Sequence, residues 1–266
     1  MGESYQGKTY ETINAWVEDG IGYMQFNRPK AMNAVNFKLL DEAIVVLEQY
    51  KYDPEVRVII ICGDERSFAA GADLRVWHEL NAFEARDGND KVHATINAVE
   101  DNHKPVIAAV RGLALGGGLE LVLACDIRII AEDATLGLPE INLGIFPGGG
   151  GTQRFPRCSA INIVKQYVYT GDFFDAATAY RIGLANIVVP ADQVMDTARK
   201  MARRIAKKSP LALREAKNAI NMSMNVDIKS GLRAEQIAWA GLFSSQDQKE
   251  GMKAFLENRK AVFQGK

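Results

Sequence analysis

The chain has 266 residues, of which 47% are apolar and 24% are charged, and its formal net charge is −1. This length suits one large domain or a domain with an appendage, and the composition is that of a globular protein. The near-zero charge gives no indication of a polyanionic partner such as nucleic acid. No apolar run reaches 18 residues, so the sequence predicts no transmembrane helix.

Two further features concern the cellular setting. The first eleven residues, MGESYQGKTYE, have neither an apolar core nor an arginine-rich amphipathic pattern, so no targeting segment is expected. Cys62, Cys125 and Cys158 lie far apart, and two of them fall in or beside apolar runs. They are therefore expected to be small core residues. Together these features predict a cytoplasmic protein.

Strand and helix patterns alternate through the first 190 residues, which is typical of an α/β domain. Residues 11–26 predict two strands joined by a turn at Glu18-Asp19-Gly20. Residues 36–50 have apolar side chains at helical spacing and begin with Asn36, a residue type favoured at N-caps. Residues 58–62 are a short apolar run of the buried-strand type.

Two later regions differ in composition from the alternating part. Residues 80–95 are more polar, contain Gly88-Asn89-Asp90, and are expected to form the most mobile loop. After Pro190 the strand signal fades. Helical patterns follow, with large apolar groups on the last of them, and such surface predicts packing on the main domain or on another subunit. The expected helices cover 194–208, 210–224, 228–243 and 246–262.

The most informative stretch runs from residue 105 to residue 157. Strand-like runs at 105–110 and 127–130 enclose a glycine cluster, Gly116 to Gly118, and an apolar helical run that carries Glu120. A second acid, Glu140, precedes four consecutive glycines. A carboxylate among apolar residues needs a partner or takes up a proton, and enzymes obtain acids and bases near neutrality in this way.

Glycines at a strand-to-helix turn allow a ligand to approach the backbone, and the first N–H groups of a helix attract negative charge. An N–H at Gly117 could therefore face a developing anion. A tight packing turn followed by a helix-start glutamate explains this stretch equally well, and a surface acid after Pro139 explains Glu140. Residue patterns alone leave these alternatives open.

Several motifs, in order along the chain, resemble those of the crotonase superfamily and, within it, the enoyl-CoA hydratases. The resemblance extends from about Tyr10 to Phe263. It is carried by FNRPKAMNA (26–34), SFAAGADL (67–74), PVIAAVRGLALGGGLELVLACD (105–126), LGLPEINLGIFPGGGGTQRFPR (136–157), GLANIVVP (183–190) and EGMKAFLENRKAVF (250–263).

The resemblance implies an α/β fold with a crotonase-like ββα superhelix core in residues 1–200. It also implies a C-terminal α-helical trimerisation region in residues 201–266, because members of the superfamily are typically trimers or dimers of trimers. A homotrimer or a dimer of trimers is therefore expected, with no nucleic-acid or membrane partner. No prosthetic group and no metal are expected, and coenzyme A enters as the thioester of the substrate.

The resemblance also implies the chemistry: reversible hydration of a trans-2-enoyl-CoA. By motif position, the N–H groups of Ala72 and Gly117 stabilise the thioester oxyanion. Glu120 is expected mainly to activate water and Glu140 mainly to protonate the α-carbon, while the backbone of Gly148 lies near the catalytic water. Since such a pair titrates as a unit, the division of roles is provisional.

The coenzyme A contacts implied by the same motifs lie at two loops and in the tail. Main-chain groups near the first two motifs would bind the adenine and pantetheine arms, with two arginines as phosphate partners and a tail lysine that reaches the site of a neighbouring subunit. Plain surface charge explains each of these cations equally well. The residues are Lys30, Ala31, Ala70 and Asp73, then Arg28 and Arg75, and finally Lys260.

Other functions remain as alternatives. The absence of a P-loop motif, of a G-x-S-x-G elbow and of metal-ligand spacing among the three histidines sets aside several common chemistries. Another crotonase reaction, such as isomerisation, decarboxylation or thioester hydrolysis, is the main alternative, but the presence of both Glu120 and Glu140 favours hydration. An RNA-binding homologue that uses the basic face at 199–208 is the third reading.

Overall fold

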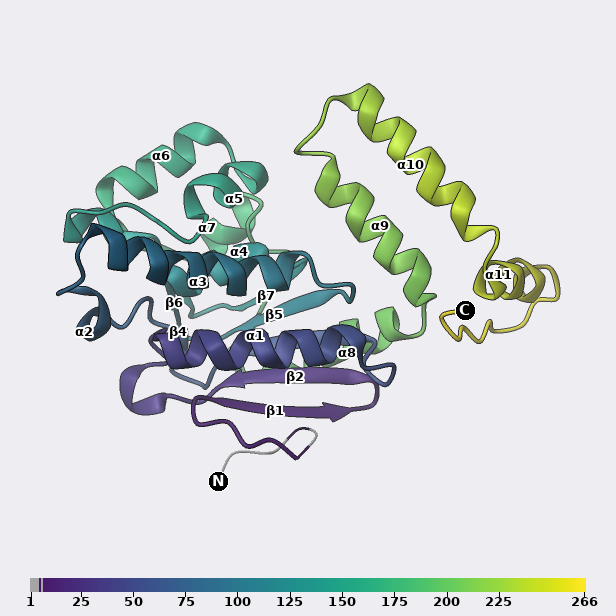
Figure 1. The fold of residues 1–266 in the computed structure, drawn as a ribbon, viewed down its shortest axis with the longest axis horizontal. Helices are drawn as coiled ribbons and strands as arrows, with labels where there is room; N and C mark the ends of the chain where they lie inside the picture. The colour runs from purple at the N-terminus through teal and green to yellow at the C-terminus, as the bar shows by residue number, and fades with distance from the viewer. Residues whose placement is uncertain (1–4, 6) are drawn as a thin grey trace.

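The computed structural model describes residue 5 and residues 7–266, so part of the stretch 1–11 interpreted above lies outside the described residues. The chain forms two β-sheets, a set of helices around them, and a helical arm at the C-terminal end (Figure 1). None of the helices among the described residues is both long enough and apolar enough to cross a membrane.

The larger sheet has six strands in the order β1-β2-β3-β5-β7-β10. β1 and β2 form an antiparallel hairpin, and every other neighbouring pair is parallel. Asp19 and Gly20 at the hairpin turn have φ of 52° and 75°, which two-residue turns of this kind require. The strands are β1 (Ile13–Glu18), β2 (Ile21–Phe26), β3 (Val58–Cys62), β5 (Val106–Val110), β7 (Ile127–Ala131) and β10 (Ile187–Val189).

The smaller sheet has the order β4-β6-β8-β9, parallel except for β9. Its strands are β4 (Ser67–Ala69), β6 (Leu113–Leu115), β8 (Thr135–Gly137) and β9 (Phe174–Asp175). β3, β5 and β7 of the large sheet are each followed by a short strand of the small sheet. The chain therefore repeats a ββα turn three times, and the predicted superhelix core is confirmed.

The helices of the core cover both faces of this double sheet. α8 packs on one face of the large sheet, against β3, β5 and β7, while α1 packs along α3 on another side of the molecule. These helices are α1 (Phe37–Tyr52), α2 (Leu74–Trp77), α3 (Ala82–Glu100), α4 (Gly117–Ala124), α5 (Gly151–Cys158), α6 (Ile161–Thr170), α7 (Ala176–Arg181) and α8 (Val194–Ala206); the short 3₁₀ turns are η1 (Pro29–Ala31), η2 (Pro139–Leu143) and η3 (Ala191–Gln193).

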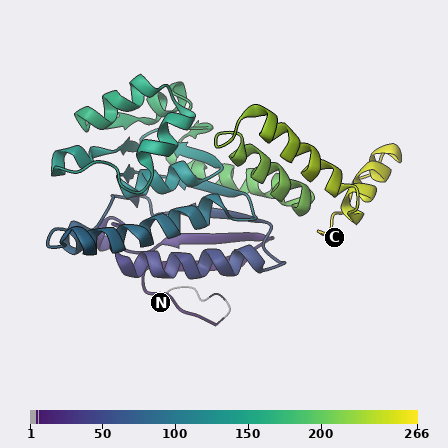
Figure 2. The ribbon, with the colours of Figure 1, turned by 45° about the horizontal axis from the view of Figure 1, so that its top comes forward.

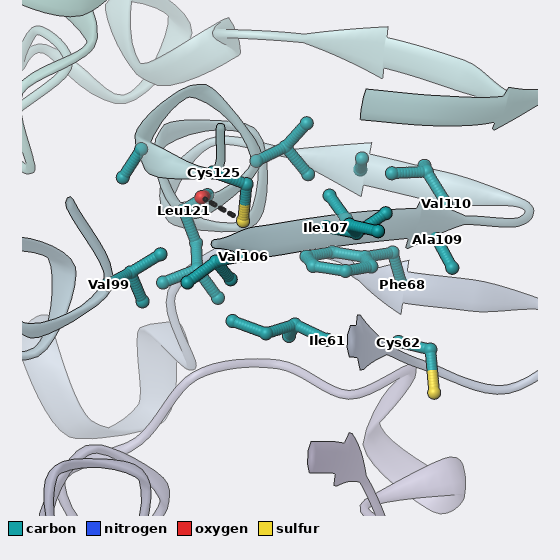
Figure 3. Close-up of a cluster of buried hydrophobic side chains, with 14 of the residues drawn as sticks. Ile61, Cys62, Phe68, Val99, Val106, Ile107, Ala109, Val110, Leu121 and Cys125 are labelled. Carbon is teal, nitrogen blue, oxygen red and sulfur yellow. Dashed lines mark hydrogen bonds between the residues drawn. The ribbon is translucent and has the colours of Figure 1, made fainter. Parts of the chain in front are cut away.

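The space between the two sheets and α4 is filled by apolar side chains (Figure 3). Phe68 of β4 and Ile107 of β5 are fully buried there, and Leu121 of α4 is nearly so. Cys125 donates from Sγ to the Leu121 carbonyl at 3.4 Å, and Cys62 and Cys125 are buried free thiols, as predicted. This packing fixes α4, and therefore Glu120, relative to both sheets.

The segment expected to be a mobile loop is instead helical: α3 spans Ala82–Glu100. Asn81 and Glu84 form a capping box at its start. Gly88 lies inside this helix, where a Cβ would lie 2.8 Å from the ring of Phe37 and 3.2 Å from that of Trp77. The glycine therefore reflects close packing of α3 on aromatic rings rather than a turn.

The last three helices, α9 (Pro210–Met222), α10 (Ile228–Leu242) and α11 (Gln246–Leu256), extend away from the core as an arm (Figures 1 and 2). The expected helix over 246–262 ends earlier, at residue 256. Lys217 of α9 joins the arm to the core, because its Nζ lies 2.8 Å from Asp126 Oδ2 and only 8% of its side chain is exposed.

Candidate active site

Three of the predicted catalytic residues follow three neighbouring parallel strands of the small sheet. Ala72 comes three residues after the end of β4, Gly117 two residues after β6, and Glu140 three residues after β8. Because parallel strands end at one edge of a sheet and adjacent strands are about 4.8 Å apart, their following residues meet in space. An ideal Cβ on Gly116 would lie 3.6 Å from Gly71 Cα and 3.3 Å from Glu140 Oε1, which shows how closely the three loops approach.

The N–H of Ala72 is directed by a bridge between this loop and Val35. Val35 donates to the carbonyl of Gly71 at 2.7 Å and accepts from the N–H of Asp73 at 2.9 Å. Both bonds use the residues on either side of Ala72. In extended backbone the polar groups of successive residues point to opposite sides, so the N–H of Ala72 points away from Val35.

Gly117 occupies the first position of α4, where a backbone N–H has no acceptor within the helix. The turn into α4 needs glycine for two reasons. Gly116 has φ of 50°, and a Cβ on Gly118 would lie 2.3 Å from the carbonyl oxygen of Ala69. A Cβ on Gly117 itself would meet nothing within 4 Å, so the space beside this N–H is open.

Glu120 lies in the first turn of α4 and is only 3% exposed. Its Oε1 accepts from the N–H of Gly149 at 2.8 Å and from that of Gly151 at 2.7 Å. Burial raises the pKa of Glu120, and these two bonds oppose that rise. Since Oε1 is engaged by two donors, Oε2 is the oxygen left to exchange a proton.

Glu140 lies in η2 and has a different environment. Its Oε2 is buried without a hydrogen-bond partner among the described residues. Burial raises the pKa of Glu140 to about 7, and the nearby charge of Glu120 adds to that rise. The two carboxyl groups are therefore unequal: one is held by main-chain donors, and the other has a free oxygen and a greater tendency to hold a proton near neutrality.

All five residues predicted to act in catalysis line one cavity of about 150 Å³. Apolar side chains from α1 and α3 form much of its wall, with others from β2, α2 and the segment after η2. The five are Ala72, Gly117, Glu120, Glu140 and Gly148; the apolar lining includes Phe26, Leu40, Ala43, Trp77, Val92, Ile96, Leu121, Ile145 and Phe146. Their roles remain predictions, but the structure brings them together.

Three of the charged residues predicted at the coenzyme A site bind one another. Asp73 is 6% exposed and accepts from Arg28 at 3.0 Å and from Arg75 at 2.9 Å through both Nε and an Nη. The bonds from Arg75 and Arg28 lower the pKa of Asp73 to about 2. The Asp73 carboxylate is thus occupied, whereas Arg75 is three-quarters exposed and retains donors for a phosphate.

The main-chain positions predicted to contact coenzyme A are partly occupied. The N–H groups of Ala31, Ala70 and Asp73 donate to carbonyls within the protein. At these three positions a ligand would therefore meet carbonyl oxygens rather than N–H groups, and the carbonyl of Ala31 already accepts from the N–H of Ala34 at 2.9 Å. Lys30 is exposed beside them, whereas Lys260 lies after α11, at the far end of the arm from α2 and β4. Within one chain Lys260 does not belong to this site.

Some residues that shape the site were not singled out from the sequence. Asn33 is fully buried and joins the 28–35 loop to the segment after β3, accepting from the Arg28 N–H and donating to the Ser67 carbonyl. Asn89 donates to the carbonyl of Gly148 at 3.2 Å. Arg154 binds the glycine loop from the other side. Their partners lie up to 59 residues away in sequence, so the spacing of residues in the sequence gave no signal for them.

Comparison of this chain with known proteins shows the family to which it belongs. Residues 17–266 match the family model described as enoyl-CoA hydratase/isomerase. The chain belongs to the enoyl-CoA hydratase/isomerase family. It is 45% identical over 255 residues to a crotonyl-CoA hydratase of Syntrophomonas wolfei, covering 96% of this chain and 98% of that protein. It is 42% identical to a short-chain-enoyl-CoA hydratase of Clostridium acetobutylicum, covering 91% and 94%.

The fold of the family is equally clear in the solved structures. A crystal structure of an enoyl-CoA hydratase from Bacillus anthracis matches this chain with a TM-score of 0.93 and 38% identity, covering 96% of this chain and all of that one. The resemblance to the crotonase superfamily inferred from the motifs is confirmed. Family membership makes an acyl-CoA the expected class of substrate for the cavity.

Proposed function

We propose that this chain is an enoyl-CoA hydratase, which adds water reversibly and syn to a trans-2-enoyl-CoA to give a 3-hydroxyacyl-CoA. The observation that carries the proposal is the pair of carboxyl groups, Glu120 and Glu140, in one apolar cavity with two main-chain N–H groups. Members of the superfamily that only move a double bond often keep one of these acids. Two acids suit hydration, which needs a base for water and an acid for the α-carbon.

The reaction follows from what each group can do. The N–H groups of Ala72 and Gly117 bind the thioester oxygen as negative charge develops on it; losing one such donor elsewhere costs about 2.7–4 kcal/mol. Glu120, fixed through Oε1, takes a proton from water through Oε2 as the water oxygen bonds to the β-carbon and the electrons of the double bond move toward the thioester oxygen. Glu140 gives its proton to the α-carbon. The reaction needs no prosthetic group, because these groups supply the acid, the base and the oxyanion donors.

The cavity favours a short acyl group. Its volume of about 150 Å³ equals that of an apolar cavity known to hold benzene, so roughly four to six carbons would fill it. A place in fatty-acid or related acyl-CoA metabolism, including β-oxidation, suits such a substrate. The free cysteines suit a reducing compartment such as the cytoplasm.

The arm supports an oligomer, and we propose a homotrimer or a dimer of trimers. Large apolar side chains on α10 and α11 are more than half exposed in the single chain, among them Leu232, Ile237, Trp239, Phe255 and Leu256. Such a surface is typical of subunit contacts. We further propose that the division between core and oligomerisation region, expected at residues 200/201, lies at α9, since α8 spans that point and packs on the main sheet. In such an assembly Lys260 would approach a neighbouring site.

The test is a panel of trans-2-enoyl-CoA thioesters of increasing chain length, followed by the loss of absorbance of the conjugated thioester. Crotonyl-CoA and the six-carbon substrate should be hydrated fastest, with a 3-hydroxyacyl-CoA as the product. A trans-3-enoyl-CoA serves as the control for isomerisation, because its conversion would raise the same absorbance. Absence of hydration for the whole panel, or faster isomerisation than hydration, would overturn the proposal.

A further inference from the structure

The glycine loop at residues 148–151 donates hydrogen bonds to the carboxylate of Glu120, and side chains of α3 and α5 donate hydrogen bonds to the loop. The peptide between Gly148 and Gly149 donates its N–H to Glu120, and its carbonyl accepts from Asn89 of α3. The N–H of Gly151 also donates to Glu120, and the carbonyl of Gly150 accepts from the backbone of α5. The remaining carbonyl, that of Gly149, lies between these two donating peptides.

That carbonyl is bound by Arg154. The side chain turns back from the first turn of α5, and one Nη donates to Gly149 O at 3.2 Å. The guanidinium also donates from Nε to Glu100 Oε2 at 3.0 Å and from its other Nη to Asn97 Oδ1 at 2.8 Å. Only 12% of the side chain is exposed. Arg154 therefore joins α3 to the loop that orients Glu120.

The loop is shaped for this guanidinium. Gly150 has φ of 106°, and a Cβ there would lie 2.1 Å from an Nη of Arg154. Only glycine permits both the backbone conformation and the contact. A cation in the first turn of a helix is disfavoured by the helix dipole. The ion pair with Glu100 offsets this unfavourable position of Arg154. The same position brings the positive charge of Arg154 toward the carboxyl of Glu120.

We propose that Arg154 is a positioning residue for hydration: through Gly149 it fixes the two N–H groups that orient the Glu120 carboxylate, while Glu100 and Asn97 fix the guanidinium. The inference rests on the proposed hydratase activity. Arg154 touches neither substrate nor water in this scheme; it acts through the loop and through its positive charge near Glu120. A purely structural role, tying α5 to α3, would affect folding but not the titration of Glu120.

That difference gives a specific readout. Among the described residues, the charged and titratable groups that act on Glu120 are Arg154 from α5, His93 from α3 and Glu140 from η2. Arg154 and His93 lower the pKa of Glu120, so removing the guanidinium raises it. Because Glu120 must be ionised to accept a proton from water, the acid limb of the kcat/KM profile then moves to higher pH.

The experiment compares Arg154→Met with Arg154→Lys, and uses Arg157→Met as the matched control. Arg157 is an exposed residue of the same helix whose Nη donates to the Gln153 carbonyl, one turn back. For crotonyl-CoA we expect Arg154→Met to lower kcat about 10- to 100-fold, the range for a misplaced catalytic group, with KM changed less than about 3-fold. Arg154→Lys should recover part of kcat, and Arg157→Met should stay within about 2-fold of wild type.

Wild-type kcat and an unmoved acid limb in folded Arg154→Met would overturn the inference. So would a loss of activity that merely follows the loss of folded protein measured by circular dichroism. If Arg154→Met does not fold, Glu100→Gln decides, because it keeps the guanidinium and weakens its anchor; it should lower kcat and leave KM unchanged, and unchanged kcat there would also overturn the inference. Failure of the wild-type enzyme to hydrate any enoyl-CoA would instead reject the proposed function.

Discussion

Glu120 and Glu140 share one cavity but differ in what holds them. Glu120 has two main-chain donors on one oxygen, whereas Glu140 Oε2 has no partner among the described residues. A carboxylate held by donors is suited to act as a base in a fixed direction. A carboxyl group with a raised pKa and a free oxygen is suited to deliver a proton. The division of roles proposed above therefore has a local physical basis.

The acid pair gives the first prediction. Glutamine keeps the size of glutamate but does not exchange a proton, so Glu120→Gln and Glu140→Gln should each lower kcat by about 10²–10⁴ with acyl-CoA binding retained. The double variant should lose far less than the product of the single losses, because the two groups act as a unit. Steady-state kinetics with crotonyl-CoA measures both effects. A single variant that hydrates its substrates as fast as wild type would contradict the two-carboxyl mechanism.

The same variants separate the two roles. Exchange of deuterium at the α-carbon of a saturated acyl-CoA requires the group that protonates that carbon. We expect this exchange to disappear in Glu140→Gln and to persist in Glu120→Gln, as followed by NMR. The reverse pattern would exchange the assignments while leaving the pair intact.

A second prediction concerns pH and stability. Burial raises the pKa of Glu140 from 4.5 to about 7, so between these values the native state holds a proton that the unfolded chain has lost. The free energy of unfolding therefore falls as pH rises through this window and then levels off. Glu140→Gln removes this titration. Its free energy of unfolding should therefore rise by roughly 1–2 kcal/mol relative to that of wild type when the pH is raised from about 5 to about 8, allowing for solvent screening. Urea unfolding of both proteins at both pH values measures this change. The same difference in unfolding free energy at the two pH values would contradict the prediction.

At the scale of elements, the start of α4 joins helix geometry to chemistry. Proline at the first helical position is compatible with a helix and has no N–H, so Gly117→Pro removes the proposed donor while α4 can still form. We expect kcat to fall about 10²–10³-fold. Gly117→Ala is the matched variant, because it keeps the N–H and adds a Cβ in open space. Its loss should be much smaller.

Circular dichroism must show that Gly117→Pro is folded before its kinetics are interpreted. A folded proline variant with near wild-type turnover would remove Gly117 from the oxyanion site. Equal losses in the proline and alanine variants would point to steric blocking of the cavity rather than to a missing donor.

The elements also show what the sequence could predict. Hairpin, buried strands and the helices around Glu120 and in the arm followed from periodicity and turn residues, because these signals are local. The sequence did not predict α3, because Gly88 is of a residue type common in loops. In the structure Gly88 packs against the rings of Phe37 and Trp77. The catalytic motifs were found by resemblance, and the structure gathers them. Asn89 and Arg154 were missed because hydrogen bonds between distant segments leave no mark on spacing.

For the whole molecule, we expect the arm to decide the state of assembly. A chain that ends after Met224 keeps α9 and the ion pair of Lys217 with Asp126, so the core is preserved, and it loses α10 and α11. We expect the full chain to be an oligomer and the shortened chain to be monomeric or to aggregate, with reduced hydratase activity. Light scattering after size-exclusion chromatography measures the masses. A soluble, fully active monomer from the shortened chain would contradict the assembly proposal.

The position of the site at the ends of three adjacent strands has a consequence for how mutations can alter the reaction of this enzyme. At the ends of β4 and β6 the proposed working parts are peptide groups, which nearly every residue type carries, whereas at the end of β8 it is a side chain. Mutation at position 72 therefore leaves the donor in place unless it introduces proline, while mutation at position 140 changes the chemistry directly. Under the proposed roles, the fold separates the binding of a thioester enolate, which uses main-chain groups, from the movement of protons, which uses side chains. A library aimed at a new thioester reaction should accordingly vary residues 139–141 and keep residues 71–73 and 116–118.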